Sequence, residues 1–210
     1  MVKSYLFLLQ LLRVVEQVLS FIPTAAQPQV EELLEATPIE IKITPKRLTK
    51  HGDFRRQPNG TSLITLNATP NPYRFLITLL HELAHFKVSQ HFYLGVKPHG
   101  TEWKTAYRNL LFPFLNPKIF PDPICSVLAQ HMKNPKASTD RDFKLVMALR
   151  KYDLPTVKTP VFELESGQHF SLDNGRVFTK LKKRRTRIEC KELKTGRIYL
   201  FSPHAEVLPE

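Results

Sequence analysis

The distribution of apolar residues between positions 71 and 88 predicts a buried helix. Asn71 is a good N-cap, and Pro72 is favoured at the first helical position because its missing N–H would have no helical partner there. Apolar side chains then recur at steps of three and four residues and also occupy the opposite face: Phe75, Leu76, Ile77, Leu79, Leu80, Leu83, Ala84 and Phe86. A helix that is apolar nearly all round is a buried one, so this segment is expected in the core.

The rest of the chain predicts a mixture of strands and helices. Alternating apolar and polar residues indicate strands at 39–44 and 61–67, joined by a polar loop at 50–60. Further helical patterns cover most of 1–36, with breaks near Pro23 and Pro28, and the ranges 101–111, 123–133 and 140–152.

A stretch of different character follows the proline-flanked linker at 155–160. Short β-like runs separated by turn signals such as Asp173-Asn174-Gly175 predict a small all-β module at 159–208. The expected fold class is therefore α+β, with one domain at 1–154 and a small basic β module at 155–210.

Composition is that of an ordinary globular protein, with 42% apolar and 24% charged residues in 210. The two cysteines, Cys125 and Cys190, provide no disulfide framework and suit a reducing compartment. We therefore expect a cytoplasmic protein.

The N-terminus admits a second interpretation. An apolar run after Lys3 resembles a short signal peptide, which would make this a secreted protein. Arg13 and Glu16 interrupt that run, which is also too short to cross a membrane. An N-terminal helix packed on the domain is the favoured reading, with no membrane association.

Residues 81–85 read His81-Glu82-Leu83-Ala84-His85, the HExxH pattern. Two histidines four residues apart share one helix face and can bind one Zn²⁺, and Glu82 would serve as the general base. Polar groups inside a buried helix need partners, because leaving them unpaired costs several kcal/mol. A bound metal ion would give these groups a partner at once. We therefore favour a metal site over two histidines that are hydrogen-bonded within an ordinary core.

A catalytic zinc usually has three protein ligands. His91 has the right spacing only if the chain turns before it, and the residue at the turning position is Val88, which resists positive φ. Glu102 opens the next helix, where a carboxylate is favourable for structural reasons alone. His99, after the helix-breaking Gly95 and before Gly100, is the favoured third ligand.

The motif followed by His99-Gly100-x-x-Trp103-Lys104 resembles the SprT-like (Spartan) zinc metallopeptidases. The resemblance covers about residues 20–208 and includes Asn134-Pro135-Lys136-Ala137-Ser138 and Arg184-Arg185-Thr186-Arg187. It implies a zincin-like domain in which His81, His85 and His99 bind zinc and Glu82 is catalytic. It also implies action on proteins associated with or crosslinked to DNA.

One departure from that family concerns the tail. Many members end in a four-cysteine zinc ribbon, whereas this tail contains Cys190 alone. A metal-free version would need an apolar core, for which the candidates are Phe162, Phe170, Val177, Phe178, Ile188, Tyr199 and Phe201.

The net charge of +12 is concentrated in the same tail. Residues 176–200 contain ten Lys or Arg against two Glu, a cluster that attracts phosphate backbones without reading sequence. Phe178 and Tyr199 would either stack on bases or belong to the core of the module. The residues assigned to nucleic-acid binding are Lys180, Lys182, Lys183, Arg184, Arg185 and Arg187.

These observations predict a zinc metallopeptidase that acts on protein substrates near nucleic acid. One alternative is a nucleic-acid-binding protein whose zinc site is structural or vestigial. A second alternative is a secreted general protease, if the N-terminal segment is a signal peptide.

Overall fold

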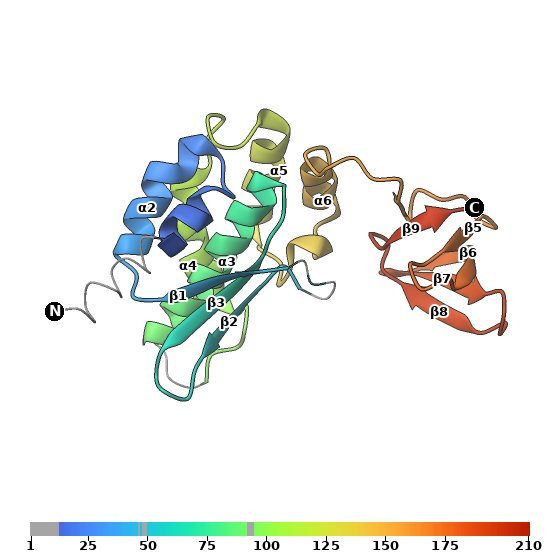
Figure 1. Ribbon diagram of the computed structural model, residues 1–210, viewed down its shortest axis with the longest axis horizontal. Coiled ribbons are helices and arrows are strands. Elements are labelled where there is room, and N and C mark those ends of the chain that lie inside the picture. The colour runs from blue at the N-terminus through green and yellow to red at the C-terminus, as the bar shows by residue number, and fades with distance from the viewer. Residues whose placement is uncertain (1–12, 46, 48–49, 92–94) are drawn as a thin grey trace. The chain divides into compact units, whose positions relative to one another are not determined.

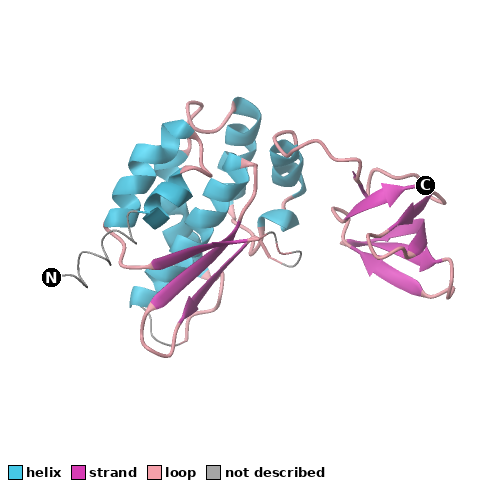
Figure 2. Cartoon of the chain, viewed as in Figure 1, coloured by secondary structure: helices cyan, strands magenta, loops and turns pink. Residues whose placement is uncertain are grey.

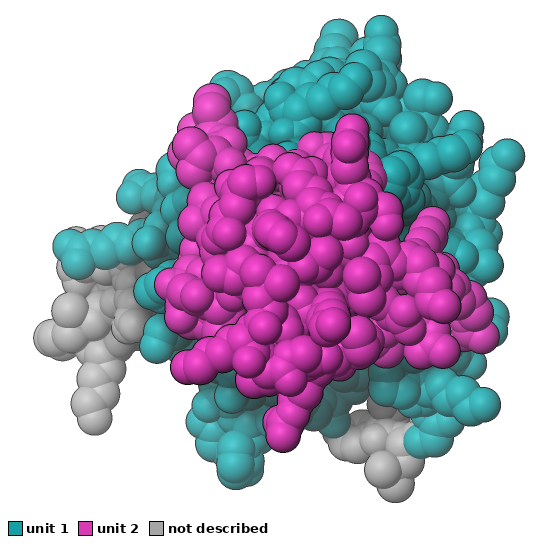
Figure 3. Space-filling model, turned by 90° about the vertical axis from the view of Figure 1, so that its right-hand side faces the viewer, with its two compact units in different colours: residues 1–153 teal, residues 154–210 magenta. Residues whose placement is uncertain are grey.

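The computed structural model describes residues 13–45, 47, 50–91 and 95–210 (Figure 1). It divides into two compact units, Met1–Asp153 and Leu154–Glu210, coloured separately in Figure 3. The first unit combines helices with a small sheet, and the second is all β (Figure 2). The expected α+β class is therefore confirmed.

Unit 1 contains a three-stranded sheet with β3 (Ser62–Asn67) at its centre. β1 (Glu40–Thr44) pairs with β3 in parallel, and β2 (Gly52–Arg56) pairs with it antiparallel. Because β3 is the central strand, β2 forms one edge of the sheet among the described strands. The buried face of the sheet includes Ile41, Ile64 and Leu66.

The expectation of a polar loop at 50–60 is wrong, because β2 lies within it. The β2–β3 hairpin closes through residues 57–61, where the Gln57 N–H donates to the Thr61 carbonyl (2.8 Å) and Gly60 has φ +84°. The side chains of β2 are half-buried or exposed, so no apolar alternation marks the strand in the sequence.

Helix α3 (Pro72–His91) begins where the sequence predicts and packs against β2, β3 and α4. The Asn71 side-chain Oδ1 accepts from the Arg74 N–H (3.0 Å), and the Asn71 side-chain Nδ2 donates to the Leu149 carbonyl (2.8 Å) and the Asp153 carboxylate (2.6 Å). Asn71 thus caps α3 and ties it to α6 and to the chain just after α6. Ten residues of α3 are buried, which confirms the prediction of a core helix.

The remaining helices surround α3 within unit 1. They are α2 (Gln27–Glu35), α4 (Thr101–Leu111), α5 (Asp122–Lys133) and α6 (Phe143–Arg150), with 3₁₀ segments η1 (Thr24–Ala26), η2 (Phe112–Phe114) and η3 (Thr139–Arg141). The helix expected at 140–152 is divided, because Asp142 is extended and its carboxylate caps α6 by accepting from the Leu145 N–H (3.3 Å).

Part of the expected N-terminal helix lies outside the described residues, which begin at 13. Residues 13–19 are helical, and Val15, Val18 and Ile22 are buried in the core of unit 1. Among the helices that the structure describes, none is both long and apolar enough to span a membrane.

Unit 2 is an antiparallel sheet with the strand order β4-β9-β5-β6-β7-β8. The strands are β4 (Thr159–Pro160), β5 (His169–Ser171), β6 (Val177–Arg184), β7 (Arg187–Glu192), β8 (Ile198–Phe201) and β9 (Glu206–Pro209). Its apolar core includes the expected Phe162, Phe170, Phe178, Ile188, Tyr199 and Phe201, together with the Cys190 side chain. Val177 is half-buried and does not belong to that cluster.

Candidate metal centre

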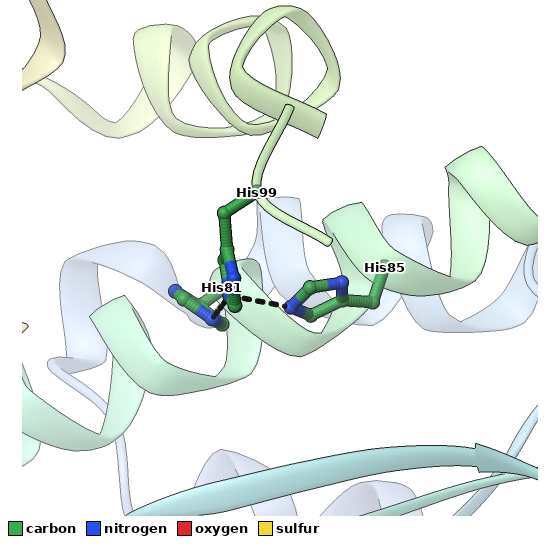
Figure 4. A group of neighbouring side chains, drawn as sticks. All are labelled: His81, His85 and His99. Carbon is green, nitrogen blue, oxygen red and sulfur yellow. Dashed lines mark hydrogen bonds between the residues drawn. The ribbon is translucent and has the colours of Figure 1, made fainter. Parts of the chain in front are cut away.

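Three histidine side chains from two segments converge in unit 1 (Figure 4). His81 and His85 lie one turn apart on α3, and His99 comes from the loop that returns to α4. The His99 Nε2 lies 3.0 Å from the His85 Nε2 and 3.2 Å from the His81 Nε2. Among the described residues, this is the one group of three or more His, Cys, Asp or Glu close enough to hold a metal ion.

A strained turn brings His99 into this position. The Gly100 N–H donates to the Lys97 carbonyl (2.8 Å), which closes a turn with Pro98 and His99 at its centre. His99 has φ +61°, a value that usually selects Gly or Asn at this place in a turn and costs about 1–2 kcal/mol for other residues. Since glycine would form the turn without strain, the imidazole itself accounts for the residue found there.

Gly100 is required beside that turn for a separate reason. A Cβ at Gly100 would lie 2.9 Å from the Lys97 carbonyl oxygen and 3.2 Å from a Glu102 carboxylate oxygen. Glycine therefore lets the chain pass directly from the histidine turn into α4.

The spacing of the three nitrogens fits tetrahedral coordination. Two nitrogens bound to one Zn²⁺ at 2.0–2.1 Å stand about 3.3 Å apart, close to the two distances above. Hydrogen bonding alone satisfies the group poorly, because the His99 Nε2 has either one N–H to donate or one lone pair to accept with, and it faces two neighbouring nitrogens. A cation would accept a lone pair from each of the three rings.

The surroundings keep these imidazoles neutral, which is the form that binds metal. Burial, reinforced by the positive charge that His85, His99 and His131 would carry, lowers the pKa of His81 to about 2. Burial and His99 lower the pKa of His85 to about 4, and burial and Arg141 lower the pKa of His99. At neutral pH each ring is uncharged, and one of its two nitrogens keeps a lone pair that a metal ion could accept.

Trp103 forms an aromatic floor under all three rings. Its ring centroid lies 4.6 Å from that of His81, 5.4 Å from His85 and 4.7 Å from His99. Tyr107 stacks on Trp103 at 4.9 Å, and its buried hydroxyl has no hydrogen-bond partner. From the sequence, Trp103 is expected only to pack in the core. In the structure it is buried and also contacts all three histidine rings.

Glu82 is buried beside this group and points toward β2. A Cβ at Gly52 would lie 2.7 Å from the Glu82 Oε1, and the backbone N–H of Phe54 donates to the Glu82 carboxylate. Burial and the neighbouring Asp53 raise the pKa of Glu82 to about 8, against the opposing effects of Arg47, Lys50 and that N–H. Glu82 is not among the clustered metal-binding candidates, which agrees with a role other than ligand.

The two rival third ligands are placed differently. His91 is exposed at the last position of α3, and Glu102 is exposed in the first turn of α4. Neither belongs to the histidine group. Of the three residues considered in the sequence, the structure brings only His99 to His81 and His85.

A pocket of about 360 Å³ opens beside the histidines. His85 and His99 line it together with Phe54 of β2, Val88 of α3 and Trp103 of α4. Space next to these candidate metal ligands is what a substrate would need.

The basic residues of unit 2 gather on the β6–β7 hairpin. Lys182, Lys183, Arg184, Arg185 and Arg187 are exposed, and Arg184 also pairs with Glu189 (3.2 Å). These five side chains lie at or next to the tip of the hairpin, where Arg184 and Arg187 form the last strand pair.

The assignment of Lys180 to nucleic-acid binding needs correction, and the structure selects the core alternative for Phe178. Lys180 is half-buried, and its ammonium donates to the carbonyls of Phe162 (3.1 Å) and Leu164, so it stabilises the fold of unit 2 instead of facing solvent. Phe178 is 1% exposed and cannot stack on a base. Tyr199 is half-buried under Arg176, whose guanidinium lies 4.7 Å from its ring centroid.

Sequence reasoning missed Gly52 and Phe54, because β2 had been taken for a loop. The signal was present in Asn59-Gly60, a dipeptide that favours a tight hairpin turn and so implies a strand on each side. Arg141 was also missed, and no pattern in the sequence marks it.

A scan of protein-family models, a search of curated proteins and a search of solved structures found no match to this chain. The residues and their geometry therefore have to carry any functional assignment.

Proposed function

We propose that this protein is a zinc-dependent metallopeptidase with a zincin-like domain of the SprT-like class. The observation that carries the proposal is the convergence of His81, His85 and His99. The buried Glu82 directly follows His81 on the same helix. The ligand set is three neutral imidazoles, which suits Zn²⁺ and leaves one tetrahedral position open. Bound zinc would act as a Lewis acid and lower the pKa of water to near 7.

The remaining chemistry belongs to this chain's own side chains. The positive charge of a bound zinc would lower the pKa of Glu82 from the raised value that it has without metal. The Glu82 carboxylate would then take a proton from the attacking water and deliver it to the nitrogen of the leaving amine. The Phe54 N–H and the close contact with Gly52 hold that carboxylate against β2. Trp103 closes the other side and keeps the three rings in place.

A peptide is the substrate that best fits the position of β2. The strand lies at the sheet edge among the described residues and contacts the general base directly. Extended peptides bind such edges through backbone hydrogen bonds. A polypeptide lying along β2 would pass close to Glu82 and to the histidines.

Metal content tests the ligand assignment. Purified protein should bind about one Zn²⁺ per chain, measured by native mass spectrometry, and His99→Ala should lose most of it. His91→Ala is the matched control, since His91 is exposed and outside the histidine group. Zinc loss in His91→Ala and retention in His99→Ala would overturn the assignment.

Peptidase activity is tested separately from metal binding. Glu82→Gln preserves the size of the side chain and removes its basicity, so it should retain zinc and cleave an unfolded protein such as casein at least a hundredfold more slowly. If the variant cleaves casein as fast as the wild type, Glu82 is not the base and the proposed mechanism is wrong.

The second candidate function is nucleic-acid binding by unit 2. The exposed basic tip at Lys182, Lys183, Arg184, Arg185 and Arg187 favours it. With Phe178 buried, the remaining attraction is electrostatic and directed to phosphates. It would bring the peptidase to proteins on DNA, or act alone if the zinc site is structural.

Salt dependence tests this second function. Reversing the charges in Lys182→Glu/Lys183→Glu/Arg185→Glu should weaken binding to a DNA duplex and make the slope of log affinity against log salt shallower by about 0.9 for each lost phosphate contact. Lys144→Glu/Lys151→Glu, at two exposed lysines of unit 1, is the control. Equal losses in both variants would contradict a specific role of the hairpin.

A further inference from the structure

The pocket beside the histidines has a chemical character that the proposed mechanism does not use. Phe54, Val88, Val96 and Pro98 supply apolar surface from β2, from α3 and from the loop before α4. Val88 stands three residues after His85, so the two share a face of α3. The apolar surface therefore adjoins two of the proposed metal ligands, His85 and His99.

The polar groups that line the pocket do not favour a polar ligand. The Ser89 hydroxyl already donates to the Phe86 carbonyl within α3 (2.7 Å). Lys97 is exposed and would repel a cation, and the lining residues that the structure describes include no carboxylate. A volume of about 360 Å³ lies at the small end of ligand pockets, which suits a side chain better than a whole cofactor.

We infer that this pocket selects substrates with a large apolar side chain next to the scissile bond. The inference rests on the proposed metallopeptidase function and adds a substrate preference to it. Leucine and phenylalanine are the preferred residues because each removes an apolar side chain from water on binding. Lysine is disfavoured, since its ammonium would meet Lys97 without a carboxylate to pair with.

Hydroxamates allow the pocket to be measured without turnover. Acetohydroxamate has a zinc-binding group and no side chain, whereas the N-acetyl hydroxamates of glycine, leucine, phenylalanine and lysine add one side chain each. Calorimetric titration of the zinc-loaded full chain should show leucine and phenylalanine binding about ten- to a hundredfold more tightly than glycine. The lysine compound should bind no more tightly than glycine.

Two substitutions place that preference in the pocket. Val96→Glu adds a carboxylate on a loop, so it should remove most of the preference for leucine and improve binding of the lysine compound. Val88→Thr keeps the shape of the side chain and should reduce the leucine preference by a smaller factor. Phe112→Glu is the control, because Phe112 is 72% exposed and outside the lining.

The outcomes separate the two proposals. If acetohydroxamate binds but leucine and phenylalanine bind no more tightly than glycine, the pocket inference is wrong and the metal site stands. Retention of the full leucine preference in Val96→Glu overturns it as well. If acetohydroxamate fails to bind the zinc-loaded protein, the metallopeptidase proposal falls and the pocket inference with it.

Discussion

Gly52→Ala is expected to disturb the candidate site through a single added methyl group. The new Cβ would stand 2.7 Å from the Glu82 Oε1, 2.8 Å from the Glu82 Cγ and 2.8 Å from the Thr78 Cγ2. Real Cβ atoms essentially never approach other atoms so closely, so something must move. Two of the three atoms lie close to the α3 backbone, so rotating the end of the Glu82 side chain cannot relieve the whole clash.

The size of the effect follows from measured overpacking. Inserting a methyl group into a packed interior costs about 1–3 kcal/mol. With a urea dependence of about 2 kcal/mol per M, a loss of 2 kcal/mol lowers the unfolding midpoint by about 1 M. Casein cleavage should fall as well, because the Glu82 carboxylate is displaced, whereas zinc content should stay near that of the wild type because the three histidines are untouched.

Compensation provides a stringent check. Thr78→Ser removes the crowded methyl group and keeps the hydroxyl that donates to the Arg74 carbonyl (2.8 Å), so it should restore part of the stability lost in Gly52→Ala. Gly60→Asn is the control in the neighbouring turn, where nothing lies within 4 Å and asparagine tolerates φ +84°. An unchanged urea midpoint in Gly52→Ala would refute the packing of Glu82 against β2.

Three further predictions concern stability. Lys180→Ala should destabilise the protein by about 1–3 kcal/mol in urea unfolding because two carbonyls lose their donor, whereas Lys182→Ala should stay within about 0.5 kcal/mol. In the metal-free Glu82→Gln variant, the opposing titration of Glu82, whose pKa is raised to about 8, is absent. The unfolded histidines take up protons near pH 6.5, while folded His81 and His85 have pKa values of about 2 and 4, so this variant should lose stability as pH falls from 6.5 toward 4. A urea midpoint that does not fall between pH 7.5 and pH 5 would contradict this. Asn71→Ala should cost about 2–4 kcal/mol by thermal unfolding, since it removes both a helix cap and two donated hydrogen bonds.

The sequence predicted those elements whose pattern repeats over many residues. Helix α3 is predicted by its N-cap residue and by apolar residues on all of its faces, and α4 matches the predicted range 101–111. β2 has five residues with no buried side chain, so its identity depends on pairing with β3, which is a tertiary contact. Gly52 could not be predicted for the same reason, because its role depends on the tertiary contact with the Glu82 side chain.

The spacing of the HExxH motif predicts two of the candidate metal ligands, His81 and His85. The third depends on the path of the chain after the motif, which the spacing does not define. His91 and His99 both follow the motif, and the choice between them depends on where α3 ends and how the chain turns back. The structure adds the positive φ at His99 and the three ring contacts of Trp103, neither of which has a signature in the sequence. In the tail, charge predicted the exposed hairpin tip but could not separate Lys180, which points inward to backbone carbonyls.

The case for chemistry in unit 1 is stronger than the case for binding in unit 2, because only unit 1 concentrates energetic costs in one place. His99 has an unfavourable backbone conformation, Glu82 is a carboxyl group that is 6% exposed, and the neighbouring imidazoles share too few protons to satisfy one another. None of these features helps the chain to fold, and such costs gather where a structure is preorganised for a ligand or a reaction. The basic hairpin has one such feature, the positive φ of Arg185 (+23°) at its turn, but its exposed lysines and arginines are well solvated and tolerated on any surface. Its role therefore depends on the salt-dependence measurement, whereas the three histidine nitrogens already lie close enough together to hold a metal ion.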